Sequence, residues 1–466
     1  MTPEYALYFH IPFCTHRCAY CDFNTYAGHE SLIPAYVEAL IREVEFVARA
    51  APQRLPVHTI FFGGGTPSLL TPHQFERILQ TVRSNFTLVP TPSSNPSTLY
   101  APSIPPGSSG SSALSGSSDT SGSSETSLEA NPGTVTLASL KGLRQAGFNR
   151  ISYGVQSFHP DELHMLERIH NPFDVLDAVR WARQAGFGNL NLDLIYGLPE
   201  QTLSRWQASL RHAVELAPEH LSLYALTIEN GTPFGSWAAH GLLPLPDPDL
   251  AADMYEAASD FLAEQGYHQY EISNWAQPGF QCRHNLQYWR NLPYLGFGAG
   301  AHGCANGLRV SNVLRIKTYI EHFISLHSSP TSLFPPFPIS PATVTRSALT
   351  RHTEMQETLM LGLRLTQEGV SAQSFWERFG QELMDVFGNE INELVDLGLL
   401  EFPRQNHPLP PDQGAPAVRT PPSPLGEGAD AQQPHPSSER EGAGVRIRLT
   451  PRGRLLGNQV FLRFVD

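Results

Sequence analysis

The sequence has little cysteine, no long apolar run and no block of basic residues. Only five cysteines occur among 466 residues, and the N-terminal residues MTPEYALYFH lack the basic leader of a secretory signal, so a reducing, cytoplasmic location without disulfides is expected. No run reaches the roughly 18 apolar residues of a spanning helix, so no transmembrane segment is expected. Lys and Arg number 31 against 44 Asp and Glu, a net charge of -13, which disfavours a surface that binds nucleic acid through its phosphates.

Three of the cysteines gather near the N-terminus, at Cys14, Cys18 and Cys21. Their C-x3-C-x2-C spacing follows the apolar run Tyr5–Ile11, so a predicted strand delivers them into a loop. Three close thiolates can hold a [4Fe-4S] cluster and leave one iron open to a ligand that is not protein. Zinc and buried structural cysteines remain alternatives, although zinc prefers paired C-x2-C units with two further ligands, and no second Cys or His pair stands at a suitable distance.

Short apolar segments alternate with amphipathic helical segments, the pattern of a parallel sheet with helices outside it. The predicted strands are Tyr5–Ile11, Val57–Phe62, Ser127–Ala130, Ile151–Val155, Leu190–Ile195 and His220–Leu226. The predicted helices are Ile33–Arg49, Pro72–Asn85, Leu137–Gly147, Pro160–Ile169, Phe173–Gly186 and Thr202–Ala217. These units predict an α/β fold, a partial (β/α)6 barrel, in which functional residues lie at the C-terminal ends of the strands.

Glycines and polar residues stand where these strands end. The run Gly63–Thr66 can approach a ligand closely and offer amide groups, although a tight turn explains it equally well. Glu129, Gln156 and Asp193 follow or end three later strands, and carboxylates among apolar residues are costly unless they are paired or functional. Each residue alone is also compatible with a helix cap or an internal salt bridge. As a set they predict a ligand pocket.

The stretch YFHIPFCTHRCAYCDF, residues 8–23, resembles the cluster loop of radical S-adenosylmethionine (SAM) proteins. The resemblance implies that Cys14, Cys18 and Cys21 hold a [4Fe-4S] cluster whose open iron binds SAM. An electron from the cluster then cleaves SAM to methionine and a 5'-deoxyadenosyl radical, while the protein supplies placement and excludes water. By the same resemblance, the residues expected against SAM are Tyr8, Tyr20, Phe23, Gly64, Gly65, Thr66, Glu129, Gln156, Arg168, Asp193 and Thr227.

Two branches of this family resemble the chain. Oxygen-independent coproporphyrinogen III oxidases have a further cysteine where this chain has Phe23, and a long arm before the first strand where Tyr8 follows only seven residues. The stretch CRHNLQYW, residues 282–289, resembles the HNxxYW motif of the HemW haem chaperones. This second resemblance implies that His284 ligates haem iron, with Tyr288 and Trp289 against the porphyrin. A loop packed by its aromatics, with His284 hydrogen-bonded to the backbone, is the alternative.

The resemblance therefore implies a haem chaperone that binds a [4Fe-4S] cluster, SAM and haem. Its expected partners are a haem-acceptor protein, thought in the family to be respiratory or membrane-associated, and an electron donor to the cluster. A coproporphyrinogen III oxidase is the alternative function. Whether the chain is an enzyme stays open, because the fold permits reductive SAM cleavage and the residues do not decide whether it accompanies haem transfer.

The rest of the chain is expected to form a small second domain and two insertions. The barrel is assigned to residues 1–89 and 127–310, a linker to 311–345, and a winged-helix-like module to 346–466. The insertions 90–126 and 403–444 are predicted to be disordered, because they have too few large apolar residues to offset their ordering entropy. In the module, the predicted helices and strands are Glu354–Leu365, Ser374–Leu397, Leu399–Phe402, Val445–Leu449 and Leu455–Phe464.

Overall fold

The computed structural model describes residues 3–90, 124–324, 336–403 and 445–465. The chain divides into two compact units, residues 1–367 and 368–466. Most of the two predicted insertions, residues 91–123 and 404–444, lies outside the described residues. In the part of the chain that the structure describes, no helix combines the length and the apolar character that a membrane crossing needs.

Six parallel strands form the centre of the sheet in the first unit, and they match the six predicted strands. They are β1 (Tyr5–Ile11), β4 (Pro56–Gly64), β6 (Glu125–Ala130), β7 (Arg150–Gln156), β8 (Leu190–Tyr196) and β9 (His220–Ala225). They pair in the order β9-β8-β7-β6-β4-β1. Among the described strands the sheet runs from one edge to the other without closing. The predicted α/β partial barrel is therefore confirmed.

The sheet is extended at both edges by shorter strands. Beside β1, β12 (Tyr294–Phe297) pairs in parallel, and β13 (His302–Ala305), β14 (Leu308–Asn312) and β15 (Thr343–Ala348) follow in antiparallel order. Beside β9 lie β11 (Asn274–Ala276) and β10 (His268–Glu271). Two-residue strands β2 (Phe13–Cys14) and β3 (Tyr26–Ala27) pair with each other, and β5 (Thr87–Leu88) pairs with β4.

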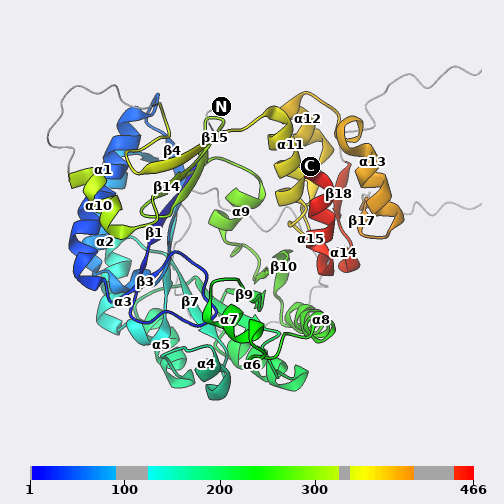
Figure 1. Cartoon of the computed structure of the whole chain (residues 1–466), viewed down its shortest axis with the longest axis horizontal. Coiled ribbons are helices and arrows are strands. Elements are labelled where there is room, and N and C mark those ends of the chain that lie inside the picture. The colour runs from blue at the N-terminus through cyan, green and yellow to red at the C-terminus, as the bar shows by residue number, and fades with distance from the viewer. Residues whose placement is uncertain (1–2, 91–123, 325–335, 404–444, 466) are drawn as a thin grey trace, which may run out of the picture. The chain divides into compact units, whose positions relative to one another are not determined.

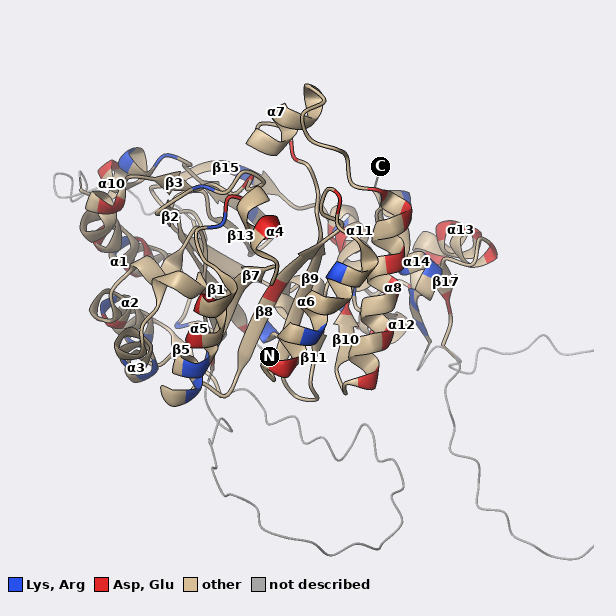
Figure 2. Ribbon diagram, turned by 90° about the horizontal axis from the view of Figure 1, so that it is seen from below, with Lys and Arg blue, Asp and Glu red and all other residues tan. Residues whose placement is uncertain are grey.

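Helices cover the outer face of the six strands (Figures 1 and 2). They are α1 (Ile33–Ala50), α2 (Pro72–Asn85), α3 (Leu137–Ala146), α4 (Pro160–Met165), α5 (Pro172–Gln184) and α6 (Leu203–Glu215). Successive side chains of a strand point to opposite faces, so Leu7, Phe9 and Ile11 of β1 join the apolar core. Tyr8 and His10 point the other way, into the barrel, where polar side chains meet at the strand ends.

The predicted linker 311–345 was wrong, because it contains regular structure. It includes part of β14, the helix α10 (Ile316–Ile324) and the start of β15. Buried and exposed residues do not alternate along β15, because most of its residues are exposed. The predicted insertion 90–126 is also too long at its end, because Glu125 and Thr126 are buried in β6.

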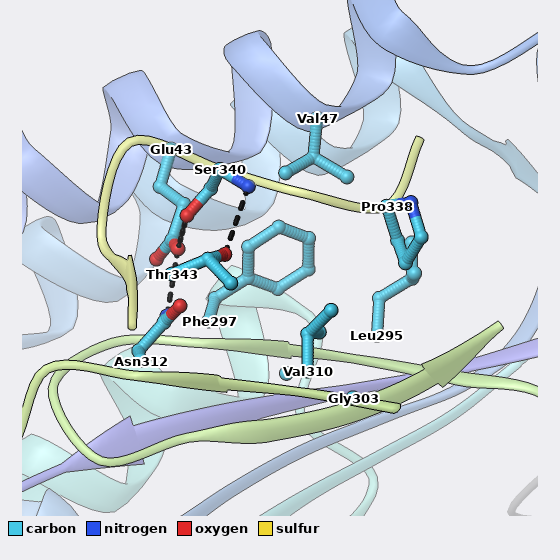
Figure 3. Close-up of a pocket in the computed structure, with 11 residues that line it drawn as sticks. Glu43, Val47, Leu295, Phe297, Gly303, Val310, Asn312, Pro338, Ser340 and Thr343 are labelled. Atoms are coloured by element: carbon cyan, nitrogen blue, oxygen red, sulfur yellow. Dashed lines mark hydrogen bonds between the residues drawn. The ribbon is translucent and has the colours of Figure 1, made fainter. Parts of the chain in front are cut away.

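A pocket beside α1 shows what holds this extension in place (Figure 3). Glu43 is 1% exposed, and its carboxylate accepts hydrogen bonds from the Gly298 amide, Asn312 Nδ2, the Tyr319 hydroxyl and the Ser340 hydroxyl, at 2.6–2.8 Å. Four donors satisfy most of the acceptor capacity of one carboxylate. The residues that line this pocket include none of those predicted to bind the cluster, SAM or haem.

Helices between the strands and after them complete the first unit. They are α7 (Pro233–Ala239), α8 (Pro248–Glu264), α9 (Arg283–Trp289) and α11 (Arg351–Gly362). The helix predicted at Glu354–Leu365 corresponds to α11, which belongs to this unit. The compact units therefore divide after Gln367 rather than at the predicted boundary before residue 346.

The second unit contains short helices around a three-stranded sheet. Its strands are β16 (Val370–Ser371), β17 (Leu400–Glu401) and β18 (Arg446–Leu449), in the order β16-β18-β17. Its helices are α12 (Ala372–Phe379), α13 (Leu383–Asp396), α14 (Pro451–Leu455) and α15 (Gly457–Phe461). The single helix predicted over Ser374–Leu397 was wrong, because Gly380 ends α12 in a left-handed conformation at φ +59°.

Candidate functional site

The loop after β1 carries the three N-terminal cysteines and folds back on itself. The strands β2 and β3 close its base, and the Cys21 amide donates to the Cys18 carbonyl oxygen at 3.2 Å. Burial raises the pKa of the Cys14 thiol, and the thiols of Cys21 and Cys18 raise it further. Three thiols that would repel one another as thiolates fit a group that supplies positive charge, as cluster iron does. In the described residues, no group of three or more His, Cys, Asp or Glu side chains is placed to hold a single metal ion.

The glycines at the end of β4 and directly after it are required by the close approach of β1 and of the cysteine loop. A Cβ atom on Gly65 would lie 2.6 Å from the Phe13 carbonyl oxygen and 3.0 Å from Cys14 Sγ. Gly64 adopts φ +116°, and a Cβ atom there would lie 2.6 Å from the His10 ring. The backbone at this strand end therefore lies directly against the loop, as the predicted glycine motif requires.

Glu129 lies at the same strand ends as the glycines. Its Oε2 accepts a hydrogen bond from the Gly64 amide at 3.0 Å. Burial raises the pKa of Glu129 to about 7, and the neighbouring carboxyl of Asp193 adds to the increase. Burial also raises the pKa of Asp193, whose carboxylate accepts from Ser152 Oγ at 2.9 Å and from Asn191 Nδ2 at 2.8 Å. These two half-buried carboxyl groups therefore lie close enough to affect each other, and a cationic ligand beside them would favour their ionised forms.

Arg168 is a half-buried cation of this region. Its Nη2 donates to the Gly154 carbonyl oxygen at 2.6 Å and to Asn131 Oδ1 at 2.5 Å, and its Nη1 donates to Cys18 Sγ at 3.5 Å. Its buried Nε has no hydrogen-bond partner, which is the state expected of a donor that a ligand would satisfy. Gln156 lies beside it and adopts φ +67°, which is uncommon for a residue other than glycine and typical of functional sites.

The remaining residues predicted to bind SAM lie in different environments. Tyr8 stacks on Phe61, with ring centroids 6.3 Å apart, and its hydroxyl is hydrogen-bonded to His10 Nδ1 at 3.0 Å. Burial raises the pKa of Tyr20, which lies close enough to the charge of Arg168 to feel its opposing effect. Phe23 is 61% exposed, and Thr227 is exposed beyond the end of β9. The structure therefore gathers the other residues at the strand ends and leaves these last two open to solvent.

His284 lies inside the first unit, near the start of α9. It is 1% exposed, its Nδ1 is hydrogen-bonded to Thr59 Oγ1 at 2.9 Å, and its Nε2 is hydrogen-bonded to the Tyr288 hydroxyl at 3.0 Å. Its ring stacks on Phe61 at 4.9 Å. Burial lowers the pKa of His284 to about 3, so the imidazole is neutral near pH 7, as an iron ligand must be. Both nitrogens are occupied in this conformation, however, by side chains rather than by the backbone.

Two residues that were not predicted from the sequence link other parts of the site through hydrogen bonds. Asn131 follows Glu129 in the stretch LEANPG, and its Nδ2 donates to Thr66 Oγ1 at 3.0 Å. Glu125 accepts from the amides of Arg283 and His284 at 3.2 Å each, and so caps the start of α9. The position of Asn131 two residues after Glu129 could have indicated its role. Nothing in the sequence indicated a role for Glu125, which lay in the segment assigned to the insertion.

Comparison with known proteins agrees with this geometry. The description "Radical SAM superfamily" matches residues 8–213, and "HemN C-terminal domain" matches residues 349–409. The "Heme chaperone HemW" of Bacillus subtilis is 36% identical over 394 residues, which are 84% of this chain and 92% of that protein. The chain belongs to the HemW family of radical SAM proteins. Radical SAM proteins use a [4Fe-4S] cluster and SAM, so the predicted family and these two cofactors are supported.

Further relatives agree with the HemW family. The "Heme chaperone HemW" of Escherichia coli is 40% identical over 302 residues, 65% of this chain and 70% of that protein. Among solved structures, coproporphyrinogen III oxidase (HemN) from Escherichia coli superimposes with a TM-score of 0.69 at 22% identity, covering 99% of this chain and 90% of the other. At that identity the likeness shows the fold shared by HemW and HemN.

Proposed function

We propose that this chain is a haem chaperone that binds a [4Fe-4S] cluster, SAM and haem and delivers haem to an acceptor protein. The observation that carries the proposal is the similarity, over most of both chains, to relatives named haem chaperones. The HNxxYW segment supports it, because it lies in α9, where the His284 ring contacts Tyr8 of β1 and Phe61 of β4 and the Tyr288 ring contacts Tyr294 of β12.

The residues at the strand ends fit the cluster and SAM. Cys14, Cys18 and Cys21 would hold the cluster, because they are thiols gathered in one loop without competing disulfides. The unpartnered Nε of Arg168 and the carboxyl groups of Glu129 and Asp193 suit a ligand with both anionic and cationic groups. The remaining residues proposed to contact SAM are Tyr8, Tyr20, Phe23, Gly64, Gly65, Thr66, Gln156 and Thr227. When bound, the reduced cluster supplies the electron that cleaves SAM.

Haem is the cargo of the proposed chaperone, and His284 is the proposed ligand of its iron. In the described conformation the Tyr288 hydroxyl occupies His284 Nε2, so ligation of iron through Nε2 requires this hydrogen bond to break. A net hydrogen bond contributes about 0.5–1.5 kcal/mol. Removing the hydroxyl should therefore make haem binding about 2- to 12-fold tighter, since each 1.4 kcal/mol is a factor of ten.

An anaerobic haem titration of the full chain tests this assignment. His284→Ala should abolish the absorbance of bound haem while leaving iron, sulfide and SAM binding intact, and Tyr288→Phe should tighten haem binding. His302→Ala is the matched control, because His302 is the exposed histidine of β13. Unchanged haem binding in His284→Ala would refute the assignment to His284.

Haem transfer is tested with the haem-loaded chain and an apo-haemoprotein as acceptor. The chaperone function predicts that acceptor absorbance appears as the bound haem disappears, faster than from free haem in the presence of albumin. Release of carbon dioxide from coproporphyrinogen III by the reduced, SAM-loaded chain would contradict the proposal and favour an oxidase.

A further inference from the structure

A continuous chain of hydrogen bonds links Cys14 to Cys18 through three side chains. Thr66 Oγ1 donates to Cys14 Sγ at 3.6 Å, and Asn131 Nδ2 donates to Thr66 Oγ1 at 3.0 Å. On the other side, Arg168 Nη2 donates to Asn131 Oδ1 at 2.5 Å, and Arg168 Nη1 donates to Cys18 Sγ at 3.5 Å. Two cysteines four residues apart in one loop are thus joined through groups from the ends of β4 and β6 and from the segment after α4.

Asn131 is the centre of this chain of bonds and contacts neither cysteine through it. Its primary amide carries a donor and an acceptor, so the nitrogen binds the Thr66 hydroxyl and the oxygen binds the guanidinium of Arg168. Because the Thr66 oxygen accepts from Asn131, its own proton is directed to Cys14 Sγ. An aspartate here would lack the donor, and an alanine would lack both groups.

The position of Asn131 is fixed by its surroundings. Its backbone carbonyl oxygen accepts from the Thr134 amide at 3.0 Å and from the Thr134 hydroxyl at 2.7 Å. Gly154 leaves room for the assembly, because a Cβ atom there would lie 2.9 Å from Gln156 Nε2 and 3.2 Å from Arg168 Nη2. The Gly154 carbonyl oxygen also accepts from Arg168 at 2.6 Å. These contacts fix the side chains of the network relative to one another.

Hydrogen bonds donated to ligand sulfurs stabilise the more negative, reduced state of an iron-sulfur cluster and raise its reduction potential. We infer that Asn131 is a positioning residue that raises this potential by orienting one donor toward Cys14 and another toward Cys18. The inference rests on the cluster site of the proposed function, and it is independent of haem.

The test measures the cluster itself in the anaerobically reconstituted full chain, with Asn131→Ala and Asn131→Leu as variants. Dithionite titration followed by absorbance and electron paramagnetic resonance should show a lower reduction potential in both. We expect the equilibrium constant for one-electron reduction to fall about tenfold, which is about 59 mV. Asn149→Ala is the matched control, because its amide donates to the Ser124 carbonyl oxygen at 2.9 Å and accepts from the Thr126 amide at 2.8 Å, at the opposite end of β6. Its potential should equal that of the wild-type chain.

A double-mutant cycle with Thr66→Val separates positioning from a purely structural role. If Asn131 acts through the Thr66 hydroxyl, the shift in the double variant is smaller than the sum of the single shifts. Unchanged potentials in both Asn131 variants, additive shifts, or failure of both variants to fold while Asn149→Ala folds would each overturn the inference. A wild-type chain without a cluster would overturn the proposed cluster site together with it, whereas loss of haem binding alone would leave the inference intact.

Discussion

Replacing Gly65 with alanine should damage the cysteine loop directly. The new Cβ atom would lie 2.6 Å from the Phe13 carbonyl oxygen, which must therefore move away by at least about 0.4 Å to reach the 3.0 Å limit of real contacts. That oxygen also accepts from the Thr66 amide at 2.7 Å, and the Gly65 amide donates to the Ile11 carbonyl oxygen at 2.9 Å. Both backbone hydrogen bonds oppose a movement of the Phe13 oxygen away from residue 65. Overpacking of this kind costs about 1–3 kcal/mol.

The cost falls on the loop that would hold the cluster, whereas the whole fold is stable by about 5–15 kcal/mol. We therefore expect a folded Gly65→Ala variant whose retention of the cluster is weakened about 5- to 150-fold, at 1.4 kcal/mol per factor of ten. Iron and sulfide per chain, measured after anaerobic reconstitution and a chelator challenge, test this expectation. Gly133→Ala is the control, because its nearest contact would be an ordinary 3.8 Å to the His170 Cβ atom. Wild-type retention of iron in Gly65→Ala would show that the loop does not need this close approach.

Two further predictions concern the carboxyl groups of Glu129 and Glu43. The pKa of Glu129 is about 7 in the folded chain, above its ordinary 4.5. The free energy of unfolding of the cluster-free chain should therefore fall as the pH rises from about 4.5 to 7. Glu129→Gln should remove this loss, so that above pH 7 the variant is more stable than the wild-type chain by up to about 3 kcal/mol. Urea unfolding at pH 5 and pH 8 tests it, and an equal effect at both would contradict it. Glu43→Gln should lower the free energy of unfolding by about 1–3 kcal/mol, since its amide nitrogen would meet donors rather than acceptors. Glu45→Gln is the control, because Glu45 lies on the same helix with a side chain that is 46% exposed. It should change the free energy of unfolding little in the same urea unfolding experiment.

Local sequence patterns were sufficient to predict the strands and helices of the barrel. They did not predict segments whose structure depends on contacts with distant residues. The strand Tyr5–Ile11 and the helix Pro72–Asn85 were predicted with the bounds that the structure has. Each lies in an apolar or amphipathic run whose period is set by the backbone alone. The sequence predicts a linker at 311–345, whereas in the structure Asn312 and Ser340 of this segment donate hydrogen bonds to Glu43, more than 250 positions away in sequence. Nothing local in the sequence carries that contact.

The candidate site shows the same division. The spacing of the cysteines and the position of the glycines predicted the loop and the strand end that meet it, and the structure places them in contact. For His284, the sequence motif indicated a candidate haem ligand but not its burial or its hydrogen-bond partners. Its burial and its two hydrogen bonds come from Thr59 on β4 and Tyr288 on α9.

Residue type and spacing specified the available chemical groups: three thiols in one loop, a glycine turn at the end of a strand, and carboxyl groups at strand ends. Which of these groups lie together, and which donors face which sulfurs, followed from the packing of distant segments, and the role inferred for Asn131 depends on that packing. The physical reason is that residue type and spacing act within a few residues along the chain. Burial, pKa and hydrogen-bond partners depend instead on segments that are distant in sequence and are brought together by the core.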